Sequence, residues 1–346
     1  MGGTGVGPSR AEMDTKRYSV RPFQEWDYES LAHLQSLLLP ELPTSAEEER
    51  EWDKALERSH LLNEKWAVEV RGSGEVAAVA ALNQAPYAYH PHKFWVSLLV
   101  DAAHEGQGVG RALASLLDGE AVAHRAACFW TNVRKDRARS MKFAAQQGFV
   151  ELRTTWLSVL DLSTADPGPV EESASRSERE GIRFTTLAQE GPRRSEVLHR
   201  LFDLWTEASR DTPRMGEFSP PSFSQFEAQI ERFSMVPEAF FLAAHGDEYV
   251  ASSHLERDLA TPDTLLIGFT GTRASYRGRG LATELKRRSI EYARRVGVRY
   301  LKTLNDSLNG PIWAINERLG FRRTAELSNM QRDFPPPPAE TTGRPQ

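Results

Sequence analysis

Two glycine-rich turns, each placed between an apolar run and a helix-patterned segment, constrain this chain more than any other feature. The turns span residues 104–110 and 276–282, and they follow the strand-like runs 94–100 and 265–269. Glycine lets the backbone turn tightly, and a helix that begins at such a turn leaves its first N–H groups unpaired at the positive end of the helix dipole. Each turn is therefore predicted to bind phosphate oxygens.

The two turns belong to an internal repeat. Gly280 follows Gly108 by 172 positions, and two Gly-Phe pairs, which begin at Gly148 and Gly320, are also 172 positions apart. An ungapped repeat that extends from each turn to its Gly-Phe pair predicts two copies of one fold in tandem.

Length and composition agree with two domains. The chain has 346 residues, of which 40% are hydrophobic and 26% charged, and this balance is typical of globular proteins with domains of about 150 residues. Segments without apolar periodicity are interpreted as tails or as a linker. The predicted divisions are a tail at 1–16, an N-terminal domain at 17–162, a linker at 163–180, a C-terminal domain at 181–334 and a Pro-rich tail at 335–346.

Charge and cysteine content exclude some classes of protein. The formal charge of −5 argues against a dedicated nucleic-acid binder, which is normally basic. Cys128 is the only cysteine, so no intrachain disulfide forms, and its apolar surroundings at 126–130 favour a buried structural thiol over a nucleophile. No run approaches the roughly 20 apolar residues of a membrane span. We expect a cytoplasmic protein without nucleic-acid or membrane partners, and the oligomeric state stays open.

Hydrophobic periodicity predicts the same order of elements in both halves. In the first half, strands are predicted at 18–23, 66–70, 76–82, 94–100, 128–133 and 149–162, and helices at 31–38, 46–62, 111–123 and 137–147. The strand at 149–162 is expected to complete the first sheet. In the second half, strands are predicted at 182–187, 240–244, 249–255, 264–272 and 300–304, and helices at 196–208, 223–233 and 281–296, before a closing helix and strand from Asn309 to Phe321.

The motif Arg277-x-x-Gly280-x-Ala282, followed by a helix and then by the pair Gly320-Phe321, resembles the acyl-CoA-binding motif of the GNAT family of N-acetyltransferases. The resemblance implies an α/β fold in which each domain has a central mixed, splayed sheet flanked by helices. It also implies acetyl-CoA as the co-substrate and no metal. The tandem arrangement is similar to that of mycothiol synthase.

The resemblance assigns the cofactor-binding residues. The turn would bind the pyrophosphate through backbone N–H groups, and the splayed strand before it would pair with the pantetheine arm. In the second half these residues are Phe269, Thr270, Thr272, Arg277, Gly278, Arg279, Gly280, Leu281, Ala282 and Asn309. In the first half they are Leu98, Val100, Gly106, Gln107, Gly108, Val109 and Gly110.

The catalytic groups are less clear from the sequence. Many GNAT enzymes carry a tyrosine acid four residues before the closing glycine, whereas this chain has Ala144 and Asn316 there. The amide of Asn316 can hydrogen-bond a thiolate but cannot protonate it. Glu256 is the first candidate for the base and His254 the alternative, and strand alternation puts both on one face of the sheet.

Several other polar residues have two interpretations. The aromatic loop at 86–92 and the loop at 211–217 either shape an acceptor site or pack over the sheet. His90 and His92 lack clustered ligands for a metal site. One or two of the basic residues around the second turn are available for the 3′-phosphate, from the set Arg277, Arg279, Lys286, Arg287 and Arg288. The basic residues of the helix after the turn are interpreted mainly as a solvated helix face. They are Lys286, Arg287, Arg288, Arg294 and Arg295.

The sequence therefore predicts an acetyl-CoA-dependent N-acetyltransferase that acts on a primary amine of a small molecule. The C-terminal domain is the expected active site, because Glu105 in the first motif would repel a pyrophosphate whereas Arg277 in the second would attract it. Two alternatives stay open. The chain is a non-catalytic acyl-CoA sensor or interaction protein, or its acceptor is an amino sugar conjugate as in mycothiol synthase.

Overall fold

The computed structural model describes residues 12–164, 180–191, 194–232 and 234–335 of the chain. The predicted tails at 1–16 and 335–346 and the predicted linker at 163–180 fall largely outside these residues. No helix in the described part of the chain is long and apolar enough to cross a bilayer.

The first half of the chain, residues 17–162, folds into elements close to those predicted. One of the predicted helices, 46–62, ends at Arg58, because His60 adopts a left-handed φ of 54° that directs the chain into the next strand. The elements are β1 (Tyr18–Pro22), η1 (Glu25–Asp27), α1 (Tyr28–Leu38), α2 (Ala46–Arg58), β2 (Asn63–Val70), β3 (Val76–Asn83), β4 (Lys93–Val100), η2 (Ala102–His104), α3 (Val109–Ala123), β5 (Cys128–Arg134), α4 (Ala138–Gln146) and β6 (Val150–Asp161).

The second half, residues 181–334, repeats this order. The helix predicted at 223–233 ends at Ile230, and the strand after it begins at Met235. The elements are β7 (Ile182–Thr186), α6 (Leu187–Glu190), α7 (Ser195–Arg210), α8 (Phe223–Ile230), β8 (Met235–His245), β9 (Glu248–Arg257), β10 (Thr264–Thr272), η3 (Ala274–Tyr276), α9 (Leu281–Arg295), β11 (Tyr300–Asp306), α10 (Gly310–Arg318) and β12 (Arg322–Asp333).

The repeat seen in the sequence is also the repeat of the structure. Four pairs of elements begin and end at positions 172 residues apart: α3 with α9, β5 with β11, α4 with α10, and β6 with β12. Within these elements, residues that differ by 172 in number occupy equivalent places, and we call them equivalent residues below.

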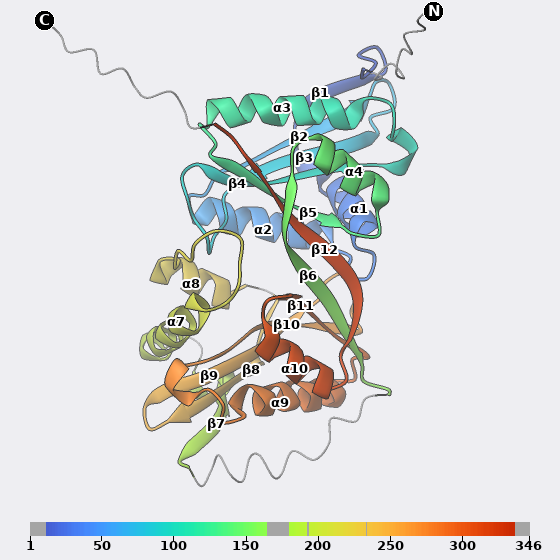
Figure 1. The fold of residues 1–346 in the computed structure, drawn as a ribbon. Helices are drawn as coiled ribbons and strands as arrows, with labels where there is room; N and C mark the ends of the chain where they lie inside the picture. Colours follow the sequence, from blue (N-terminus) through green and yellow to red (C-terminus); the bar gives the residue numbers. More distant parts are fainter. Residues whose placement is uncertain (1–11, 165–179, 192–193, 233, 336–346) are drawn as a thin grey trace, which may run out of the picture.

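The two halves share one mixed sheet and exchange their last strands. The strand order is β1-β2-β3-β4-β5-β12-β6-β11-β10-β9-β8-β7. The expectation that 149–162 would complete the first sheet is wrong, because β12 pairs with β5 and β6 pairs with β11. Figure 1 shows β6 and β12 crossing together between the two halves. Leu160 of β6 accordingly lies in the second-half core with Leu285 and Phe321.

The central pair of strands is antiparallel and nearly symmetric. Thr155 of β6 pairs with Leu327 of β12, its own equivalent residue. Arg323 of β12 lies over two aromatic rings from the two halves, 4.9 Å from the centroid of Trp156 and 4.2 Å from that of Trp313. The exchange therefore joins the two halves through backbone pairing and through stacked side chains.

Helices cover both faces of the shared sheet. In the first half, α3 packs on one face through Leu113 and Leu117, and α1 packs on the other through Leu31 and Leu34. In the second half, α9 takes the place of α3, and α7 and α8 take the places of α1 and α2. Each half therefore has two apolar cores, one on each side of the sheet.

Candidate functional site

Both predicted turns have the backbone geometry of an anion site. Gly106 and Gly108 have left-handed φ values of 78° and 84°, and Gly278 and Gly280 have 77° and 81°. Gly108 and Gly280 are the N-caps of α3 and α9, and neither helix has a side-chain cap. The N–H groups of each first turn thus lack the oxygen that a Ser or Asp cap supplies. The space in front of the second turn is open to a phosphate, whereas the backbone of Glu12 and Met13 lies against Gly108 of the first.

The strand before each turn separates from its parallel neighbour. β4 pairs with β5 only through residues 93–95 and 128–130, and β10 pairs with β11 only through residues 264–266 and 300–302. Beyond these pairs, backbone N–H and C=O groups of β4 and β10 face a V-shaped opening. An extended amide-containing chain such as pantetheine can pair with them as an added strand would.

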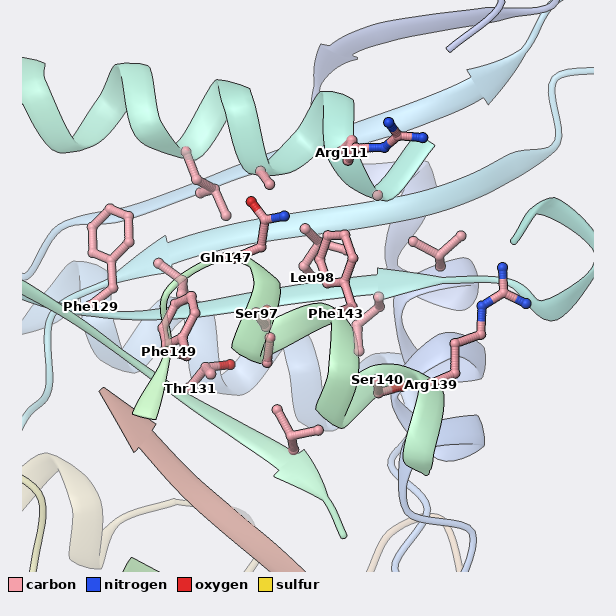
Figure 2. A pocket seen from close by; sticks show the side chains of 18 of the residues that line it. Ser97, Leu98, Arg111, Phe129, Thr131, Arg139, Ser140, Phe143, Gln147 and Phe149 are labelled. Atoms are coloured by element: carbon pink, nitrogen blue, oxygen red, sulfur yellow. The ribbon is translucent and has the colours of Figure 1, made fainter. Parts of the chain in front are cut away.

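In the first half this opening is a cleft of about 360 Å³. Its walls come from β4, the glycine turn, α3, β5 and α4. Figure 2 shows the guanidinium groups of Arg111 and Arg139 at one end and the rings of Phe129 and Phe149 at the other. A long ligand with a phosphate end and an apolar arm would match this division of charge.

Most of the cofactor-binding residues predicted in the first half line this cleft. Leu98, Val100, Gly106, Gly108 and Gly110 do so. The side chains of the other two predicted residues, Gln107 and Val109, turn away from the opening, so these residues can contribute only backbone groups. Gln107 accepts a 2.7 Å hydrogen bond from Tyr18, and Val109 is buried in the core beneath α3.

A salt bridge changes the expected charge of the first turn. Glu105 lies 2.8 Å from Arg139 of α4, and both residues line the cleft. His104 does not face the turn, because its ring bonds to Tyr18 at 2.9 Å and to Glu75 at 3.0 Å. The repulsion expected between Glu105 and a pyrophosphate is therefore offset by Arg139.

Replacing Arg139 with alanine should weaken acyl-CoA binding to the first half by about 3- to 10-fold. The variant leaves Glu105 without its 2.8 Å partner beside the phosphate site. Calorimetric titration measures the change, in a Gly280→Val background that disables the second turn. Lys142→Ala removes another exposed cation of α4 and should bind as the parent does. Equal losses of affinity in Arg139→Ala and Lys142→Ala would contradict a specific role for the Glu105–Arg139 salt bridge.

The second turn differs in its neighbours. Arg277 lies 2.8 Å from Asp211, which belongs to the loop predicted to shape the acceptor site. The guanidinium of Arg279 lies 4.8 Å from the ring centroid of Tyr276. A Cβ on Gly278 or Gly280 would meet no atom within 4 Å, so the space in front of this turn is open.

The other residues predicted to bind cofactor in the second half fall into two groups. Phe269, Thr270 and Thr272 stay partly exposed along β10, where an extended ligand can reach them. Leu281 is buried, and Asn309 accepts a 3.4 Å hydrogen bond from the Ile312 N–H as the cap of α10.

The inner part of the second opening is filled by side chains. Lys286 is 1% exposed and donates a 2.8 Å hydrogen bond to Asn316, whose amide in turn donates to Asn305 at 2.8 Å. Their equivalents in the first half are Ala114 and Ala144, which line the open cleft, and Val133, which lines it as well.

The position of Lys286 is an exception to the interpretation of the basic residues of α9 as mainly a solvated helix face. Lys286 points inward, and burial lowers its pKa to about 7. The signal that could have identified it is the repeat itself, because its equivalent Ala114 belongs to the apolar face of α3. Arg294 and Arg295, in the last turn of the same helix, are exposed as expected.

His254 and Glu256 form a pair next to the bulge of β10. His254 Nε2 lies 3.1 Å from Glu256, which also accepts a 2.8 Å hydrogen bond from Arg232. A Cβ on Gly268, within the bulge, would overlap the two side chains. Burial raises the pKa of Glu256, but the hydrogen bond and charge of His254, with the charge of Arg232, outweigh it and lower the pKa to about 2.

This arrangement favours His254 over Glu256 as a base. The oxygens of Glu256 already contact His254 and Arg232, which leaves this carboxylate less available to an incoming amine. If His254 donates its Nε2–H to Glu256, then Nδ1 carries the lone pair, and this buried Nδ1 has no hydrogen-bond partner among the described residues. Sequence reasoning missed Arg232, which lies just beyond α8 and is far from Glu256 along the chain.

The two loops predicted to shape an acceptor site meet at the contact between the halves. Tyr87 accepts two hydrogen bonds through its carbonyl, one of 3.4 Å from Arg214 of the second loop and one of 3.1 Å from the Ser219 N–H just beyond that loop. Its hydroxyl donates to Gln229 of α8, and its ring lies 5.2 Å from that of Trp205. The first half therefore contributes a wall next to the His254–Glu256 pair of the second half.

Other side chains suited to catalysis or metal binding lie outside the two openings. Cys128 is buried, and burial raises its pKa to about 11, as expected for a structural thiol. The rings of His90 and His92 pack edge to face. Glu64, Glu120 and His124 are partly exposed and bring ligand atoms within 4.8 Å of one another.

Comparisons with known proteins agree with this geometry. The model of the acetyltransferase (GNAT) family matches residues 28–149 and 198–321. A GCN5-related N-acetyltransferase from Sphaerobacter thermophilus is 20% identical with a TM-score of 0.69, over 93% of this chain and 96% of that one. A tandem GNAT protein from the clavulanic acid biosynthesis pathway is 20% identical with a TM-score of 0.68, over 92% and 99%.

A third similar structure is part of a larger protein. The glucosamine N-acetyltransferase region of a fungal multi-domain β-N-acetylglucosaminidase is 16% identical with a TM-score of 0.66. The match covers 94% of this chain and 39% of that one. No match was found among curated proteins.

Proposed function

The chain belongs to the acetyltransferase (GNAT) family, and we propose that it transfers an acetyl group from acetyl-CoA to a primary amine of a small molecule. The observation that carries the proposal is the pairing, in both halves, of a left-handed glycine turn with a splayed strand. One element binds the phosphates and the other the amide-rich arm of the same ligand.

The second half is the proposed catalytic centre. Strand pairing places Ala81 and Asn83 in the first half where His254 and Glu256 lie in the second, because Ala80 pairs with Leu98 as Ser253 pairs with Thr270. The residue equivalent to Asn316 is Ala144. The first half thus has an open cleft but no titratable side chain at these places. We assign it acyl-CoA binding without turnover, so the alternative of a non-catalytic acyl-CoA site applies to this half of the chain.

The proposed reaction uses groups of the second half. The acceptor amine gives a proton to Nδ1 of His254, whose ring Glu256 orients through Nε2. The amine nitrogen attacks the thioester carbonyl, and a backbone N–H near the β10 bulge stabilises the oxyanion. The C–S bond then breaks, and the sulfur leaves with its electron pair.

The acceptor is proposed from the hydrogen-bond acceptors of the same region. Glu256 and Asp211 place carboxylate oxygens near the opening, where they can accept hydrogen bonds from an amine, although each is also paired with an arginine, Arg232 or Arg277. A small amine is the first proposal, and an amino sugar conjugate, as in mycothiol synthase, is the alternative. A cytoplasmic location is proposed as well.

Release of free thiol from acetyl-CoA with a panel of small amines and amino sugars tests the function. We expect at least one amine to raise the rate well above hydrolysis. If acetyl-CoA binds but no primary amine supports release, the chain is an acyl-CoA sensor rather than an enzyme acting on amines.

Replacing Ala114 with phenylalanine should fill the first-half cleft and remove one of two acyl-CoA sites. Ala114 lines the cleft and is 7% exposed, so the ring would occupy space that the ligand needs. Calorimetry should then report one site per chain instead of two, while amine-dependent thiol release persists. Loss of turnover in a folded variant would instead place catalysis in the first half.

A further inference from the structure

The buried side chain of Lys286 is not explained by the fold. The amine lies against Asn316 at 2.8 Å and 5.6 Å from the ring centroid of Phe321. Burial of a lysine without a carboxylate partner destabilises a protein, because the charge is removed from water. Such a group is expected to serve a purpose that offsets its unfavourable burial.

The first half shows whether the fold itself requires these buried polar side chains. α3 and α4 pack on β5 as α9 and α10 pack on β11, yet the first half has Ala114, Ala144 and Val133 where the second has Lys286, Asn316 and Asn305. The fold therefore forms without this polar chain. This set of three polar side chains occurs only in the half that also carries His254 and Glu256.

The three side chains form a directed relay from the core to the opening. The Lys286 amine donates to Oδ1 of Asn316, and Nδ2 of Asn316 donates to Oδ1 of Asn305. Lys286 and Asn316 are buried, whereas Asn305 is partly exposed. Asn305 lies on β11 beyond Lys302, the last residue paired with β10, and so at the edge of the opening.

The donor direction leaves one end of the relay available to a ligand. Because Oδ1 of Asn305 accepts from Asn316, its Nδ2–H₂ group is the end available to the opening between β10 and β11. A cation at the inner end polarises both amides and strengthens the outer N–H as a donor. An anion that develops in the opening would be stabilised by this donor.

We propose that Asn305 donates a hydrogen bond to the sulfur of the departing coenzyme A, and that Lys286 is a positioning residue that orients and polarises Asn305 through Asn316. This inference rests on the proposed function of the second half. The acetyl C–S bond breaks, its electron pair stays on sulfur, and the proton lost by the amine goes to His254. Lys286 keeps its own proton, and the relay stabilises the thiolate in place of a protonating acid.

Binding of coenzyme A and of desulfo-coenzyme A, which lacks only the sulfur, tests the proposal. Calorimetry in the Ala114→Phe background reports on the second half alone, and it is carried out at pH 6, below the pKa of about 7 of the Lys286 amine, so that this amine is charged. We expect the parent to prefer coenzyme A, and Lys286→Met to reduce this preference about tenfold while its affinity for desulfo-coenzyme A stays near that of the parent. The same variant should lower kcat with little change in the KM for acetyl-CoA.

A second variant and a matched control complete the test. Asn305→Ala removes the outer donor at a partly exposed position and should lose the sulfur preference even if Lys286→Met fails to fold. Lys302→Met removes another buried lysine of the second half, which lies near Asp258, and should keep the preference. If Asn305→Ala or folded Lys286→Met still prefers coenzyme A over desulfo-coenzyme A as strongly as the parent does, the proposed relay is wrong but the proposed function is unaffected. Failure of the parent to bind either ligand overturns the proposed function with it.

Discussion

Replacing His254 with glutamine should lower kcat by about 10²–10⁴-fold and leave the affinity of the second half for acetyl-CoA nearly unchanged. Glutamine can still donate a hydrogen bond to Glu256, but it cannot accept the amine proton. The ring is 8% exposed and stacks on Phe240, so it sits in one defined orientation beside the β10 bulge. Initial rates of thiol release, with calorimetry for binding, measure both effects.

His199→Gln is the matched control for this variant. His199 also stacks on a phenylalanine, Phe223, but it lies on the exposed side of α7 away from Glu256. Its replacement should leave the rate unchanged. Glu256→Gln should reduce kcat as well, because His254 loses the partner that sets its tautomer. A parental rate in His254→Gln, with a loss only in Glu256→Gln, would return the role of base to the carboxylate.

Replacing Gly280 with valine should weaken acetyl-CoA binding to the second half by about 100-fold or more. The φ of 81° at Gly280 is unfavourable for a β-branched residue. The turn would therefore shift, and its N–H groups would no longer point at the phosphates. Hydrogen bonds to a charged group contribute about 1.5–3 kcal/mol each, so losing two of them accounts for such a change. Calorimetric titration in the Ala114→Phe background measures it.

The same helix supplies the control. Gly297, just beyond the end of α9, has a φ of 79° and, like Gly280, no atom within 4 Å of an added Cβ. Gly297→Val therefore imposes similar backbone strain at the opposite end of the helix. It should lower stability to a similar degree and bind acetyl-CoA as the parent does. Unchanged affinity in Gly280→Val would remove the turn from the binding site.

The order and type of the elements could be predicted from the sequence, because they depend on local interactions. Apolar periodicity and glycine positions identified both turns, with Gly106, Gly108, Gly278 and Gly280 at left-handed φ values in the structure. The helix ends were less predictable. At His60, for example, a non-glycine residue adopts a positive φ that its own identity does not require.

The side-chain contacts of the two openings were less accessible to sequence reasoning. The pairing of Glu105 with Arg139 joins two elements, and the pairing of Arg232 with Glu256 joins another two. Charge alone said that Glu105 would repel a phosphate, and only the position of α4 brought a cation to within 2.8 Å of it. Similarly, the charge of Lys286 suggested solvent, whereas its place on α9 turns it into the core.

The sequence by itself determined that two copies of one fold occur in this chain and where the glycine turn of each copy lies. Both the repeat and its glycines can be seen directly in the order of the residues. Only the tertiary structure decided which copy completes which sheet. β6 and β12 are equivalent segments with equivalent backbone donors and acceptors, so either could pair with β5 or with β11. In the observed arrangement Thr155 also pairs with Leu327 at the centre of the sheet, and Trp156 and Trp313 lie around Arg323. These contacts join segments far apart in the chain, so local sequence patterns do not reveal them.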